Sequence, residues 1–199
     1  SALGAVDDVM PNAYEESWDI LDTDGTNTTG SPLTIGGGGG ANMFIYTSPS
    51  VAGATLTMAY QNDGGAAAVA DSYTDFAIAY SPEMVEGLTV GYARADQNAG
   101  VSIDVDKSTM YAKYAVGGFT VGYQVSEADH DTKSSSADVV AYGVTYAVND
   151  DFSIGYHSHT YEPDSGTSAT GKGTSDQEST GISASYTMGG MTLAGAMNE

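Results

Sequence analysis

The sequence predicts an all-β fold, a transmembrane antiparallel up-and-down β-barrel. Short segments after residue 40 alternate apolar residues with small or polar ones, which is the period of a strand with one oily face. Similar segments recur at intervals of 32, 31 and 33 residues, the length of a strand pair with its connections. The connections alternate between short turns and long polar loops, as in a barrel whose tight turns lie at one membrane surface.

Each expected strand has an apolar residue at every second position, and most end in tyrosine. In Leu88–Tyr92 and Phe119–Tyr123 the order is apolar, polar, apolar, small and tyrosine. The intervening residues, such as Thr89 and Gly122, form a small or polar face that is expected to point inward. The expected strands are Met43–Tyr46, Leu56–Tyr60, Phe76–Tyr80, Leu88–Tyr92, Met110–Tyr114, Phe119–Tyr123, Val140–Tyr146, Phe152–Tyr156, Ile182–Met188 and Met191–Gly195.

The connections between these strands are of two kinds. Short turns, such as Val116–Gly118 and Met188–Gly190, are expected at one end of the barrel. The long polar loops expected at the other end are Asn62–Thr74, Asp96–Lys107, Glu127–Asp138 and Glu162–Glu178. We expect the acidic residues to lie in loops and turns, because the strand segments hold one lysine, Lys113, and no acid. A soluble β-sandwich is the alternative fold, although its water-facing side would carry more charge.

The composition excludes several classes of protein. Of the 199 residues, 26 are acidic and 5 are Lys or Arg, and this formal charge of -21 excludes a nucleic-acid binder. The chain has no cysteine, which excludes disulfides and thiolate metal sites. There is no apolar run of the length of a membrane helix. Three histidines, without a Gly-x-Ser-x-Gly motif or a phosphate loop, predict that the protein is not an enzyme.

The first 40 residues interrupt the repeat, so we expect two regions, 1–40 and the strands of 41–199. Residues 1–40 contain seven acidic residues and neither Lys nor Arg. Asn12 is expected to cap a short helix that places Tyr14, Trp18 and Leu21 on one apolar stripe, and this stripe would hold the segment against a wall. A solvated acidic tail is the alternative interpretation.

Two sets of residues are candidate metal ligands. Asp22, Asp24 and Asn27 place three oxygen-bearing side chains around a glycine, which predicts a calcium site, with a simple Asp-Gly turn as the alternative. His157 and His159 are expected on the same inward face of a strand, but zinc needs at least one more ligand. No cofactor is expected to be required.

The sequence resembles the general porins of Gram-negative outer membranes, most closely those of alphaproteobacteria. The resemblance rests on the acidic opening that begins with Ser1–Asp8, on the Thr47–Pro49 turn with Gly53, and on the strands that end in glycine and tyrosine. It covers the whole chain and implies a barrel of sixteen antiparallel strands. It further implies that 1–40 is the extracellular loop that folds inward to narrow the pore. The first strands and the terminal aromatic strand have no counterpart, so an incomplete chain is expected.

This resemblance implies a homotrimer in outer-membrane lipid that lets small hydrophilic solutes and cations diffuse passively through a water-filled channel. Five carboxylates in the first 40 residues are expected to line the constriction and favour cations. They are Asp7, Asp8, Glu15, Glu16 and Asp19. The basic residues expected on the facing wall are Arg94, Lys107 and Lys113. The alternative function is that of a non-conducting acidic surface β protein, either an adhesin or a structural layer protein.

Overall fold

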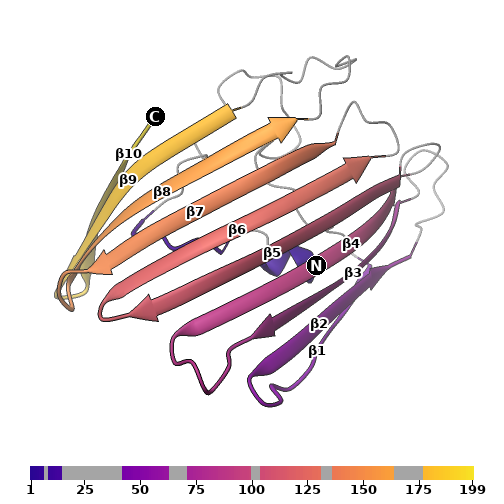
Figure 1. The fold of residues 1–199 in the computed structure, drawn as a ribbon, viewed down its shortest axis with the longest axis horizontal. Coiled ribbons are helices and arrows are strands. Elements are labelled where there is room, and N and C mark those ends of the chain that lie inside the picture. The colour runs from indigo at the N-terminus through magenta and orange to yellow at the C-terminus, as the bar shows by residue number, and fades with distance from the viewer. Residues whose placement is uncertain (7–8, 15–41, 63–70, 100–103, 131–135, 164–176) are drawn as a thin grey trace.

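The computed structural model describes residues 1–6, 9–14, 42–62, 71–99, 104–130, 136–163 and 177–199, which form one sheet of ten antiparallel strands (Figure 1). Strands that follow one another in the chain are neighbours in the sheet, so the predicted all-β, up-and-down fold is confirmed. β1 and β10 are the edges of the described sheet, which is not closed. The strands are β1 Met43–Thr47, β2 Ala54–Gln61, β3 Asp71–Tyr80, β4 Leu88–Ala99, β5 Asp104–Val116, β6 Phe119–His130, β7 Ala137–Ala147, β8 Phe152–Pro163, β9 Gln177–Met188 and β10 Met191–Asn198.

The two faces of the sheet differ in chemistry as the alternation predicts. We call the side that carries the N-terminal segment the inner face and the opposite side the outer face (Figure 1). On β6, Phe119, Val121 and Tyr123 are exposed on the outer face, whereas Gly122 and Gln124, which alternate with them, are buried on the inner face. Exposed apolar side chains of this kind continue across the neighbouring strands. Such an extensive apolar surface matches contact with lipid and is unusual for a soluble protein.

The predicted short turns are confirmed at the hairpins β5–β6 and β9–β10. Gly117 and Gly118 have φ angles of 56° and 85°, and Gly189 and Gly190 have the same values. These angles lie in the left-handed region, which residues with a side chain rarely adopt and which matches the twist of a two-residue hairpin. The paired glycines are therefore the local reason for both turns.

The strands are longer than predicted at the end opposite these turns. β4 continues to Ala99 and β5 begins at Asp104, so most of the expected loop from Asp96 to Lys107 is strand. The prediction that acidic residues lie outside the strands is therefore wrong. Beyond the lipid belt neither face of a strand needs to be apolar, although backbone pairing continues, and the alternation that marks a strand is lost there.

The buried core lies between the inner face and the N-terminal segment. This segment begins with a 3-10 helix, η1, at Leu3–Ala5. The core consists of Ala2, Leu3, Val6 and Met10 from the segment, packed with Tyr73, Ala77, Ala93, Ala95, Tyr111, Ala128, Val139 and Ala141 from the strands. In the described part of the chain, there is no helix of the length and apolar character needed to cross a membrane.

Candidate functional site

The described part of the N-terminal segment, residues 1–6 and 9–14, crosses the inner face from β3 to β9 (Figure 1). At one end, the backbone N–H of Leu3 donates a hydrogen bond of 2.8 Å to the Oδ2 atom of Asp75 on β3. At the other end, the N–H of Ala13 donates one of 3.1 Å to the hydroxyl of Ser183 on β9. The segment thus runs across the strands and is held at both ends by side chains of the wall.

The β3 end combines an apolar anchor with a buried carboxylate. Leu3 is 0% exposed and packs with the small side chains of Ala77 and Ala93 in the core. Asp75 is also buried, and its Oδ2 atom accepts a second hydrogen bond, of 2.9 Å, from the hydroxyl of Tyr73. Because a buried charge needs hydrogen-bond donors, these two donors help to stabilise the carboxylate beneath the segment.

Gln124 on β6 holds the middle of the segment. Its Nε2 atom donates to the carbonyl oxygen of Val6 at 2.7 Å, and its Oε1 atom accepts from the N–H of Val9 at 3.4 Å. The same Nε2 atom donates to the hydroxyl oxygen of Thr109 on β5 at 2.9 Å. Gln124 is not among the predicted site residues, although one long polar side chain among small inward residues is a recognisable signal in the sequence.

Glycines of the repeat make room for the segment. A Cβ atom added at Gly122 would lie 2.6 Å from the ring of Pro11, and one at Gly155 would lie 2.9 Å from the nitrogen of Ala13. At Gly143, which pairs directly with Gly122, the added atom would meet the carbonyl oxygen of Pro11. Side chains at these positions would push the segment away from the wall. At Gly122 and Gly155, the glycine before the tyrosine of the motif thus has a packing role that periodicity does not reveal.

All five predicted constriction residues lie outside the described residues. This applies to Asp7, Asp8, Glu15, Glu16 and Asp19, to the candidate calcium ligands Asp22, Asp24 and Asn27, and to Trp18 and Leu21. The predicted helix does not begin directly after Asn12, because Ala13 and Tyr14 form a bend. Tyr14 is 49% exposed, so the expectation that it anchors the segment is wrong. Leu3, Val6 and Met10 provide the described anchor.

The three predicted basic residues are divided between the faces. Lys107 pairs with Ala95 and Ala128, which are buried on the inner face, and Lys113 pairs with Gly122 on that same face. Arg94 instead pairs with Phe76 on the outer face. This corrects the expectation that Arg94 faces the constriction. Its position two residues after the outward Tyr92 is the sequence signal for its true direction.

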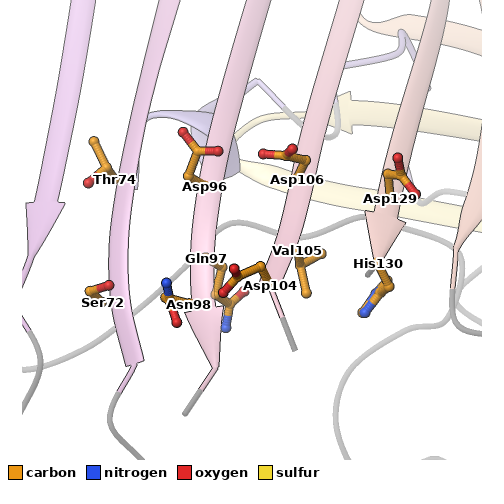
Figure 2. A pocket seen from close by; sticks show the side chains of 10 residues that line it. All are labelled: Ser72, Thr74, Asp96, Gln97, Asn98, Asp104, Val105, Asp106, Asp129 and His130. Carbon is orange, nitrogen blue, oxygen red and sulfur yellow. The ribbon is translucent and has the colours of Figure 1, made fainter. Parts of the chain in front are cut away.

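On the outer face Arg94 lies beside acidic side chains. Its Nη2 atom lies 3.3 Å from Asp106 and 3.9 Å from Asp96. Asp106 pairs with Asp96 on one side and Asp129 on the other, and all three line a cavity of about 520 Å³ (Figure 2). Among the described residues, no group of three or more His, Asp or Glu side chains has the arrangement of a metal site. These carboxylates are on the face opposite the N-terminal segment.

The comparisons with known proteins agree with this architecture. A sequence family described as Gram-negative porin matches residues 1–198. The fold is similar to that of a porin refined at 1.8 Å resolution, with a TM-score of 0.63 and 16% identity over 96% of this chain and 67% of the other. It is also similar to OmpTdeltaL8, a loop-deletion mutant of an outer membrane protein of Vibrio cholerae. Here the TM-score is 0.55 and the identity 11%, over 94% of this chain and 71% of the other. Among curated protein sequences nothing matches.

Proposed function

Because the chain belongs to the Gram-negative porin family, we propose that it forms a water-filled, cation-preferring channel through which small hydrophilic solutes and ions diffuse. Family membership confirms the porin resemblance of the sequence and places the protein in the bacterial outer membrane. The observation that carries the proposal is the N-terminal segment that crosses the inner face from Asp75 to Ser183. A segment lying there reduces the cross-section of the space that the wall encloses.

The two faces of the wall support passive diffusion. The outer face is apolar and contacts lipid, whereas the inner face carries polar residues such as Thr120 and Lys113. Solutes that fit past the segment would cross without tight binding, since conduction requires easy release. The fold and the family are those of channel proteins. Passive diffusion through the proposed channel involves no catalytic step and requires no cofactor. A homotrimer is part of this proposal, and the calcium site at Asp22, Asp24 and Asn27 stays a prediction.

Charge supports the preference for cations. The chain has a formal charge of -21, and residues 1–40 have seven acids without a basic residue. In a narrow, partly desolvated channel, fixed carboxylates lower the free energy of cations and raise that of anions. Of the three predicted basic residues, Lys107 and Lys113 lie on the inner face. Their positive charges oppose this effect only in part.

The selectivity experiment neutralises the proposed constriction in the full-length protein. We expect Glu15→Gln, Glu16→Gln and Asp19→Asn together to move the zero-current potential in a salt gradient toward that of a non-selective channel. The shift should be large in dilute salt and fade toward molar salt, because screening acts over about 8 Å at physiological ionic strength. Planar-bilayer recordings measure this potential.

A matched control removes the same number of carboxylates from the outer face. Asp96→Asn, Asp106→Asn and Asp129→Asn together should shift the potential far less, since these residues face away from the segment. Anion preference of the wild type, or equal shifts in both triple variants, would reject the proposed selectivity. A folded protein that carries no current would support the alternative of a non-conducting surface protein.

A further inference from the structure

The side-chain amide of Gln124 has one donor and one acceptor that match two backbone groups of the N-terminal segment. The carbonyl oxygen of Val6 can only accept a hydrogen bond, and the N–H of Val9 can only donate one. A primary amide offers a donor and an acceptor at its tip and meets both needs, at 2.7 Å and 3.4 Å. An ionised carboxylate has no donor for Val6, and an ammonium group has no acceptor for Val9.

The wall holds this amide rigidly. The hydroxyl oxygen of Thr109 accepts from Nε2 of Gln124 at 2.9 Å and lies 2.7 Å from the hydroxyl of Ser126. Thr109 also donates to the carbonyl oxygen of Val125 at 3.3 Å. Gln124 itself is 2% exposed, and Thr109 and Ser126 are buried as well. A buried side chain whose neighbours are also hydrogen-bonded has little freedom to turn, so the amide keeps one position relative to β6.

The other contacts of the segment act differently. Leu3 and Met10 contribute apolar burial, which is strong but not directional. The hydrogen bonds that Asp75 and Ser183 accept from the N–H groups of Leu3 and Ala13 hold the two ends of the described segment. Gln124 acts between these ends and specifies which backbone groups face β6. Without it the segment would remain close to the wall, but its position along the wall would be less defined.

We propose that Gln124 is the positioning residue that fixes the N-terminal segment on the channel wall. The consequence for conduction rests on the proposed function, in which this segment narrows the channel. Loss of the amide should allow the segment to leave its position more often, so the current through the open channel should fluctuate.

The first test is Gln124→Met in the full-length protein, because methionine has a similar length without these donors and acceptors. Hydrogen exchange at the backbone N–H of Val9 should accelerate by about tenfold, since two hydrogen bonds to the segment are lost. Single-channel recordings should show a larger variance of the open-channel current. Thr120→Ala, on the same face of β6 but nearer the short turn, should change neither quantity, and heat-modifiable gel migration shows that each variant is folded.

A second variant, Gln124→Glu, tests the chemistry and does not depend on the first. At neutral pH the carboxylate lacks a donor for Val6, so the variant should resemble Gln124→Met. When protonated, the acid again offers one donor and one acceptor, so lowering the pH should slow the exchange at Val9 and reduce the current variance. The wild type and Gln124→Met at each pH are the controls, because they show every effect of pH that does not depend on the side chain at position 124.

The outcomes separate the two proposals. Unchanged exchange at Val9 in Gln124→Met, or a Gln124→Glu variant without rescue at low pH, would overturn the positioning role of Gln124. Faster exchange together with an unchanged current would support that role. In that case the segment would not be the element that narrows the channel, and the proposed function of this segment would fail.

Discussion

Arginine at Val121 is expected to prevent the protein from folding into lipid, whereas arginine at the adjacent Thr120 is expected to be tolerated. Val121 is 41% exposed on the outer face, in the apolar part of β6 between the short turn and Glu127. A basic side chain on the lipid face costs about 2 to 4 kcal/mol near the bilayer midplane. Thr120 points to the inner face, where water can solvate the charge.

Folding into lipid vesicles, followed by heat-modifiable gel migration, measures this difference. Two more adjacent pairs serve as replicates, with Val90→Arg against Thr89→Arg on β4 and Ile154→Arg against Ser153→Arg on β8. If arginine were tolerated equally at both members of each pair, the outer face would not contact lipid and the assignment of the two faces would fail.

Valine at Gly143 is expected to displace the N-terminal segment from the wall. The added Cβ atom would meet backbone atoms of Pro11, which cannot move aside as the end of a flexible side chain can. Overpacking of this kind costs typically about 1 to 3 kcal/mol, and here relief requires the segment to move. We therefore expect a lower free energy of unfolding in urea and, if the segment narrows the channel, a larger single-channel conductance.

Gly195 on β10 provides the matched control. It is also a glycine within a strand, but no described atom lies within 4 Å of a Cβ added there. Gly195→Val should therefore leave stability and conductance close to those of the wild type. Equal effects of the two substitutions would show that the loss of stability comes from changing a strand glycine to valine, and that the contact with Pro11 is not responsible.

The sequence by itself determined the strands, their order and the direction of most side chains. Lipid on one face of the sheet requires an apolar residue at every second position. The alternation along Phe119–Tyr123 and the similar segments is therefore enough to predict each strand from its own residues. The short turns at Gly117 and Gly189 are equally local, since the required backbone angles are those that glycine adopts. The alternation also places Arg94 with Tyr92 on the outer face, so the error about its direction was avoidable.

Only the tertiary structure decided where the N-terminal segment lies and what holds it. The bond from Leu3 to Asp75 joins residues 72 positions apart, and the bond from Gln124 to Val6 spans 118 positions. Contacts over such separations follow no period, because they depend on how a folded wall brings one strand beneath another part of the chain. Gly143 shows the same limit. Its place in the alternation predicted an inward direction, but the need for glycine arises from a proline more than a hundred residues earlier in the sequence.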